Sequence, residues 1–228
     1  MIYTQSFPIQ FEPLAEPQAV VTGPNVRFTL LTSRLLRLEY SPTGEFEDRP
    51  SQAFWYRRQP VVNFELEVEN NHFDRLSERR YTLTTAHLQL VYTTSEVGFS
   101  PETLSITLKE SGATWHFGDQ DDLNLRGTAR TLDDVDGALA LEEGLLSRSG
   151  YAVVDDTPRL VFNPEGWLEP RNAPAGSHDL YFLAMGRMRM PVCRILRGWR
   201  GPPHCCRVGP WATGGAVTGL IPLRNCWG

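Results

Sequence analysis

The sequence consists of many short β-type runs, and turn residues separate them so closely that no helix of ordinary length fits between them. Up to residue 117, apolar residues alternate or form short β-rich stretches at 26–32, 35–40, 53–56, 61–68, 81–85, 88–93, 104–109 and 113–117. Short strands without an intervening helical pattern bury their apolar faces against one another. The sequence therefore predicts an all-β fold, a large antiparallel β-sandwich.

The run at 61–68 shows the alternation most clearly. Its even-numbered residues are apolar and its odd-numbered residues from 63 on are polar, which predicts a strand with one wet face: Val62, Phe64, Leu66 and Val68 against Asn63, Glu65 and Glu67.

Two further runs, 151–155 and 159–163, are split by Asp156-Thr157-Pro158. This spacing predicts that they pair as a hairpin that presents a long loop.

Composition limits the class of protein. Of the 228 residues, 41% are hydrophobic and 21% are charged, which is ordinary for a globular chain. No window approaches 18 uncharged apolar residues, so no membrane span is expected. The proline-rich start lacks a basic segment followed by an apolar run, so we expect no secretory signal and a cytoplasmic location.

Charge divides the chain at one point. All 27 acidic residues precede residue 185, whereas residues 185–228 hold seven arginines and all four cysteines. We therefore expect a leader at 1–24, one β-sandwich domain at 25–184 and a tail at 185–228 that forms no domain. In the neighbouring reading frame the tail's codons permit the sequence Trp-Trp-Ser-Arg-Tyr-Trp, which indicates out-of-frame translation.

Metal sites are not expected. Asp134, Asp136, Gly137 and Glu143 occupy positions three, five, six and twelve of a calcium-loop frame, but Leu132 stands at position one. We interpret these aspartates as turn caps. The cysteines lack the spacing of a zinc site, and the basic tail is not interpreted as a nucleic-acid-binding segment.

One segment carries a resemblance. The motif N-L-x-G-T-x-R-T-L-D-x-x-D-G spans 124–137, and G-L-L-S-R-x-G and V-x-D-D follow at 144–150 and 153–156. Upstream stand R-L-E-Y-S at 37–41 and F-E-D-R-P-S-Q at 46–52. Over roughly residues 25–184 the chain resembles the N-terminal domain of glycoside hydrolase family 31, the α-glucosidase type. The resemblance implies a galactose-mutarotase-like β-sandwich.

The resemblance also implies what this domain lacks. In the family both catalytic carboxylates are aspartates of a (β/α)8 barrel that follows the sandwich, so no catalytic residue is expected in this chain. Adjacent acids such as Asp155-Asp156 do not replace them, because neighbouring strand residues point to opposite faces. The intact enzyme would hydrolyse an α-glucoside with retention and without a cofactor. The chain alone is expected to have no turnover.

A loop of the family's sandwich reaches the substrate pocket of the barrel. Relatives commonly show S-R-D-G-W where this chain reads Ser147-Arg148-Ser149-Gly150-Tyr151. The resemblance therefore implies Arg148, Ser149 and Tyr151 as residues at the substrate rim. The alternative is that Arg148 pairs with Glu142 or Glu143 on the surface.

Two other interpretations stay open. The first is a free-standing carbohydrate-binding β-sandwich with Trp55, Trp115 or Trp167 as a platform for sugar rings, although an aromatic residue on a strand more often fills the core. The second is that the tail is a metal-binding or redox appendage.

Overall fold

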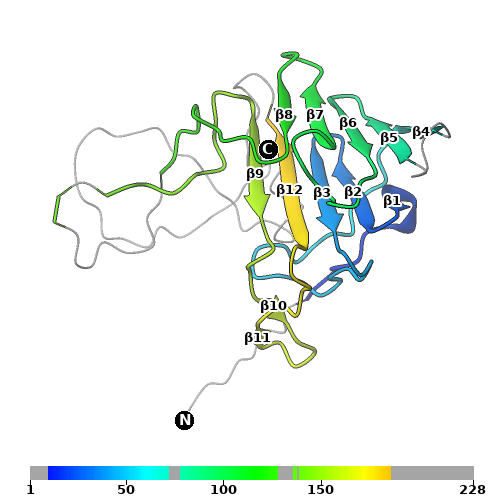
Figure 1. Cartoon of the computed structure of the whole chain (residues 1–228). Helices are drawn as coiled ribbons and strands as arrows, with labels where there is room; N and C mark the ends of the chain where they lie inside the picture. Colours follow the sequence, from blue (N-terminus) through cyan, green and yellow to red (C-terminus); the bar gives the residue numbers. More distant parts are fainter. Residues whose placement is uncertain (1–9, 72–77, 128–135, 138, 186–228) are drawn as a thin grey trace, which may run out of the picture.

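The structure, a computed structural model, describes residues 10–71, 78–127, 136–137 and 139–185. Two five-stranded sheets dominate it (Figure 1). In order across the first sheet lie β1 (Val20–Gly23), β2 (Val26–Thr32), β3 (Leu35–Tyr40), β12 (His178–Ala184) and β9 (Tyr151–Asp155). The second contains β4 (Glu65–Asn71), β5 (Glu78–Thr84), β6 (Leu88–Thr93), β7 (Leu104–Leu108) and β8 (Thr114–His116).

A small hairpin of β10 (Val161–Phe162) and β11 (Leu168–Glu169) lies apart from the two large sheets (Figure 1). All strand pairs within the three sheets are antiparallel. The one helical element in the described residues is the 3-10 turn η1 (Pro17–Ala19). The prediction of an all-β sandwich is confirmed.

The main core fills the space between the two large sheets. Leu38 and Phe182 from the first sheet and Leu90 and Ile106 from the second are fully buried in one apolar cluster. Alternation along each strand sends every second side chain into this layer. The 4.7–4.9 Å spacing of paired strands then makes each sheet a continuous apolar surface, and burial of the two surfaces against each other is the main stabilising term.

The two central strands of the first sheet are buried on both faces. All six residues of β3 are buried, and so are the last six of β12. On the outer face Leu35, Tyr181 and Leu183 form a second cluster with Phe54, whose ring stacks on that of Tyr181 at an interplanar angle of 6°. The connections around residues 41–60 and 156–177 therefore cover this face of the sheet.

Several predicted runs have the observed bounds, namely 26–32, 35–40, 88–93 and 151–155. The run at 53–56 is wrong as a strand, because Phe54 packs into the outer cluster and the segment makes only isolated bridges. The predicted leader contains β1, whose Val21 is buried in the main core. Strands β11 and β12 were not predicted at all.

The predicted hairpin of 151–155 and 159–163 is also wrong. Strand β9 pairs with β12 in the large sheet, whereas β10 pairs with β11. The chain leaves the sheet at Asp156, whose side chain is fully buried and accepts a hydrogen bond from Ser51 Oγ at 3.0 Å. This nonlocal contact turns the chain outward, so the two runs lie in different sheets.

The predicted wet-faced strand at 61–68 forms in part. Regular pairing begins at Glu65, and Val62 and Phe64 pack against the core while Leu66 and Val68 remain 44% and 43% exposed. Strand β4 is the edge strand of its sheet, so the apolar face is covered only in its first half. The predicted tail, with its cysteines and its proposed change of reading frame, lies outside the described residues apart from Met185.

Candidate functional site

The residues that carry the family resemblance lie mainly on a long arm between β8 and β9. The arm projects from the sandwich (Figure 1). Its two described sides run together as a ribbon: Leu125 N donates to Leu146 O at 2.9 Å, and Arg148 N donates to Leu123 O at 3.1 Å. The Asn124 side chain joins the sides further, since it donates to Gly144 O and accepts from Gly144 N, each at 2.9 Å.

The arm exposes an unusual number of leucines. Five of its described leucines are between 37% and 54% exposed: Leu123, Leu125, Leu139, Leu141 and Leu146. A backbone hydrogen bond joins one pair of them, Leu125 and Leu146, across the two sides of the ribbon. The arm therefore presents apolar side chains that the sandwich itself does not cover.

The three predicted rim residues lie at the base of this arm, in different environments. Arg148 is exposed. The Ser149 hydroxyl donates to Asp121 Oδ1 at 2.7 Å, so a neighbouring carboxylate already engages it. Tyr151 is the first residue of β9 and is buried in the main core, where its ring stacks on Phe182 with 5.6 Å between centroids. Their role at a substrate rim stays a prediction, with Arg148 the most accessible of the three.

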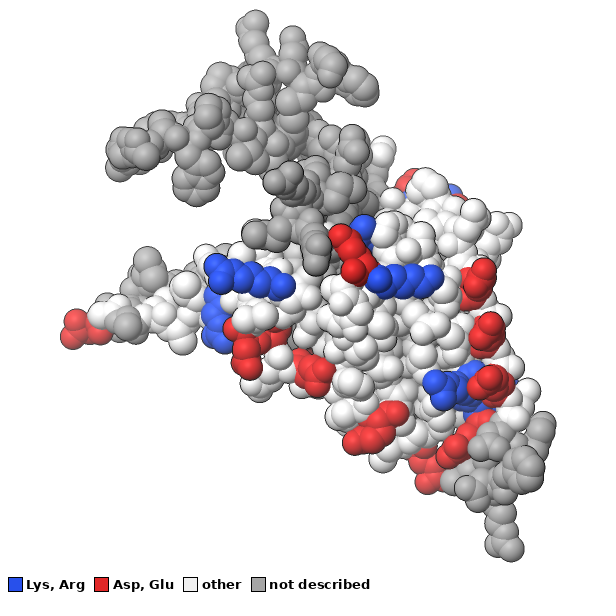
Figure 2. All heavy atoms as spheres, turned by 90° about the horizontal axis from the view of Figure 1, so that it is seen from above, with Lys and Arg blue, Asp and Glu red and all other residues white. Residues whose placement is uncertain are grey.

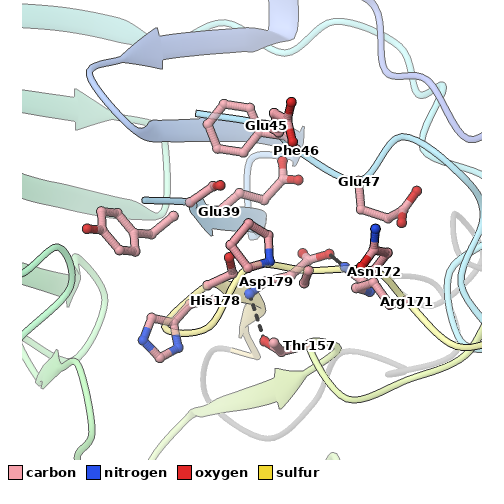
Figure 3. A pocket seen from close by; sticks show the side chains of 14 residues that line it. Glu39, Glu45, Phe46, Glu47, Thr157, Arg171, Asn172, His178 and Asp179 are labelled. Carbon is pink, nitrogen blue, oxygen red and sulfur yellow. Dashed lines mark hydrogen bonds and ion pairs between the residues drawn. The ribbon is translucent and has the colours of Figure 1, made fainter. Parts of the chain in front are cut away.

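A second feature lies at the outer face of the first sheet, where β3 ends and β12 begins. A pocket of about 310 Å³ opens there between the segments 41–47 and 171–177 (Figure 3). Its wall combines acidic, basic, hydroxyl and amide side chains with a few apolar ones. They are Glu39, Tyr40, Ser41, Glu45, Phe46, Glu47, Thr157, Arg171, Asn172, Ala173, Pro174, Ser177, His178 and Asp179.

Next to this pocket lies a buried network of ion pairs, which we call the arginine clasp: Arg37, Arg171, Asp156 and Asp179. Arg171 and Asp179 line the pocket. Arg37 binds Asp179 through two hydrogen bonds of 2.8 and 2.7 Å. Arg171 bridges the two carboxylates, with 2.5 Å to Asp179 Oδ2 and 2.9 Å to Asp156 Oδ2. The clasp therefore fastens the covering segment around residue 171 to the sheet.

Burial and neighbouring charges set the pKa values of this network. Burial alone raises the pKa of Asp179, but the charge and hydrogen bonds of Arg37, with Arg171, outweigh it and hold that pKa well below the usual value. For Asp156, burial and the nearby Asp179 charge prevail and raise the pKa to about 6. Burial also lowers the pKa of His178, so its imidazole is neutral near pH 7.

The clasp is not an arrangement for glycoside hydrolysis. Asp156 is fully buried and Asp179 is 4% exposed, and each carboxylate forms an ion pair with Arg171. A glycosidase needs two carboxyl groups that face the scissile bond from opposite sides. These two carboxyl groups instead fasten the fold.

The three candidate platform tryptophans differ in exposure. Trp115 is 3% exposed and belongs to the main core, so it offers no platform. Trp55 packs edge-on against Phe11 and Phe162. Trp167, in the β10–β11 hairpin, is 74% exposed. Of the three, Trp167 is the one that presents an open ring face.

No group of three or more His, Cys, Asp or Glu side chains within the described part of the chain is placed to hold a metal ion. Asp134 lies outside the described residues. On the face seen in Figure 2, acidic and basic side chains are intermixed on the described surface rather than gathered into a broad basic patch. No helix among the described residues is long and apolar enough to cross a membrane.

No protein-family model matches the chain, and no curated protein matches it.

The clasp was not predicted from the sequence. Arg37 and Asp156 lay within stretches that carried the resemblance, but neither was interpreted as a site residue. A signal was present, since Arg37 and Glu39 sit in a run of otherwise apolar strand residues, where ionised side chains require partners. The identity of those partners, Asp179 and Arg171, depends on the fold.

Proposed function

We propose that this chain contains the non-catalytic N-terminal β-sandwich of a family 31 α-glycosidase, a cytoplasmic enzyme of carbohydrate metabolism. In this proposal the sandwich supports a catalytic barrel and its arm helps to line the pocket that receives an α-glucoside. The observation that carries the proposal is the arm: the stretch with the family motifs projects as a ribbon with exposed leucines.

The physical argument is that these leucines favour a covering partner. Burying a leucine that is about half exposed contributes about 1 kcal/mol, so several together supply a substantial interface term. A ribbon held by its own backbone hydrogen bonds also loses little conformational freedom on docking. The arm therefore suits a domain that packs against another domain, and the catalytic barrel is the occupant that the motifs imply.

Activity of the protein by itself tests the absence of catalysis. The purified full chain is expected to release no 4-nitrophenol from 4-nitrophenyl α-glucoside, because the two aspartates of the family lie in the barrel. A variant with Arg148→Ala should give the same result. Turnover that purifies with the chain and is sensitive to a substitution within it would refute the proposal.

The gene tests the family assignment. Reading the DNA beyond residue 184 in all three frames should give a (β/α)8-barrel sequence in a frame other than the one that encodes residues 185–228. Restoring that frame should yield a longer chain that hydrolyses the same glucoside. A locus without barrel-coding sequence in any frame would contradict the assignment.

A free-standing carbohydrate-binding module is the second candidate, and the exposed ring of Trp167 favours it. Titration of soluble α-glucans should then quench tryptophan fluorescence with saturation in the full chain and fail to do so in Trp167→Ala. The buried Trp115 provides the contrast, because its emission should not respond to ligand. Absence of saturable quenching would remove this candidate.

A further inference from the structure

Strand β4 is the longest edge strand of the two large sheets in the described part of the chain. The edge strands are β1 and β9 in the first sheet and β4 and β8 in the second. Strand β4 has seven residues, whereas β1 has four, β9 five and β8 three. It lies on the side of the sandwich away from the arm (Figure 1). An edge strand presents a row of backbone N–H and C=O groups that have no partner in their own sheet.

Most features that prevent further pairing at a sheet edge are missing from β4. Its residues pair with β5 in one continuous antiparallel register, from Glu65 with Thr84 to Asn71 with Glu78, so no β-bulge interrupts the strand. The strand contains no proline. Bulges, prolines and very short strands are the common ways in which proteins protect an edge. Charge is the protecting feature that β4 does have, and all its charged side chains are acidic.

The core-facing side of β4 continues the apolar surface of the second sheet. Leu66 lies opposite Leu83 and Val68 lies opposite Tyr81, and both of these partners are buried in the main core. Leu66 and Val68 themselves remain 44% and 43% exposed. One more strand at this edge would cover them, because side chains on the same face of neighbouring strands pack against each other. Such a strand would need an apolar residue at every second position.

The opposite side of β4 carries three exposed glutamates, Glu65, Glu67 and Glu69. The ion pairs between described residues do not include them. Opposite charges on neighbouring strands stabilise their pairing, whereas like charges oppose it. A second copy of this edge is therefore disfavoured, because a pairing that aligns the two apolar sides brings the glutamates of both copies together. A strand with basic residues at alternate positions has the complementary charge.

From these features we propose that the β4 edge binds an extended basic segment of a partner protein by strand addition. The apolar residues of that segment lie over Leu66 and Val68, and its lysine or arginine residues lie beside the three glutamates. Backbone hydrogen bonds along the edge supply affinity, and the alternation of basic and apolar side chains supplies specificity. The surface goes beyond the scaffold function, because it lies away from the arm and does not depend on a barrel (Figure 1).

Amide-resolved NMR of the ¹⁵N-labelled full chain tests the proposal with a short capped peptide that alternates lysine and valine. One control peptide has glutamate in place of lysine, and the other is the lysine peptide with every amide N-methylated, which removes its backbone donors. The lysine peptide should shift the amide signals of residues 65–70 with saturation and bind at least about tenfold more tightly than either control. Equal binding of the N-methylated peptide, shifts centred on the arm or no saturable shift would overturn the proposal.

A charge exchange locates the site. Glu67→Lys reverses the middle charge of the edge, so it should weaken binding of the lysine peptide by about threefold to tenfold and strengthen binding of the glutamate peptide by a similar factor. A misfolded variant would not show this gain. Glu165→Lys makes the same change at an exposed position between β10 and β11 and should alter neither affinity by more than about twofold. Equal effects of the two substitutions would show attraction to net charge alone and refute the site.

Sedimentation of the full chain without peptide tests the other occupant, a second copy. The chain is expected to stay monomeric through this edge, because the glutamates of two copies repel each other. A dimer that the lysine peptide dissociates would assign the edge to self-association and overturn the proposal. Each of these failures leaves the scaffold proposal intact, since that proposal rests on the arm.

Discussion

Removing the bridge of the arginine clasp should destabilise the protein strongly. In Arg171→Met the two carboxylates that Arg171 joins lose a partner that is 5% exposed. Taking one partner from a buried ion pair typically costs about 3–5 kcal/mol when the remaining charge is left without compensation. Asp179 keeps Arg37, so the charge that loses its close partner is that of Asp156, which retains a hydrogen bond from Ser51 and Arg159 at 3.6 Å. Methionine keeps much of the side-chain volume, so a cavity contributes little. The expected loss is therefore a large share of the stability of an ordinary domain, about 5–15 kcal/mol.

Arg49→Met is the matched control. Arg49 also joins two carboxylates, Glu47 and Glu169, but its side chain is 35% exposed and that of Glu169 is 41% exposed. Water screens such pairs, so the control should lose no more than about 1 kcal/mol. Equilibrium urea unfolding of the full chain, followed by tryptophan fluorescence at one ionic strength, measures both free energies.

The pH dependence identifies the origin of the loss. Without Arg171, the carboxyl groups of Asp156 and Asp179 can avoid the cost of a buried charge by binding a proton, so the destabilisation should be smaller at about pH 5 than at about pH 7. A loss in Arg171→Met that matches the Arg49→Met control would refute the account of the clasp. A large loss that is the same at both pH values would show that packing, and not charge, is responsible.

Three further predictions concern the fold and the arm. Gly98 has φ +75°, and a Cβ added there would lie 2.3 Å from the Tyr40 ring. Gly112 has a similar φ of +72°, but nothing lies within 4 Å of its added Cβ. The free energy of unfolding in urea should therefore fall several-fold more in Gly98→Ala than in Gly112→Ala. Leu125→Asp should change the free energy of unfolding by less than about 0.5 kcal/mol, because the residue is exposed. The variant should bind less of an apolar dye than the native chain. Equal dye binding by the two proteins would contradict the exposed arm. Burial raises the pKa of Asp156 to about 6, above its unfolded value of 3.8, so the stability that this group contributes is fully present below 3.8 and is lost as pH rises through about 6. Urea unfolding between about pH 4.5 and 7.5 should show this fall in the native chain and not in Asp156→Asn.

Local patterning predicted strands in which polar and apolar residues alternate along the sequence. In β6 the burial alternates residue by residue from Leu88 to Thr93, and the predicted bounds agree with the observed ones. Strand β12 escaped prediction because its residues from Leu180 to Ala184 show no polar alternation. Strand β3 is also buried on both faces, but it was predicted because Arg37 and Glu39 alternate with its apolar residues. The sequence showed the turn residues around Asp156. It did not show whether the strands on either side of the turn, β9 and β10, pair with each other.

The exposures of the candidate functional residues could not be obtained from residue type. Trp115 and Trp167 are the same residue type, but Trp115 is buried between the two large sheets, whereas Trp167 is exposed on the β10–β11 hairpin. Tyr151 follows Arg148 by three residues but enters the core, because the arm joins strand β9 at that point. Only the position of each backbone relative to the opposite sheet decides such differences.

The sequence by itself determined the all-β class, most strand positions and, within the described residues, the absence of an ordinary helix, because these depend on side chains that are neighbours along the chain. The tertiary structure decided the pairing of β9 with β12, the exposed arm and the arginine clasp with its pocket. Arg37 and Asp179 are separated by 142 positions and are joined by two hydrogen bonds. A contact of that kind leaves no periodic signal in the sequence, since its energy arises only when the sheet brings both side chains out of water together.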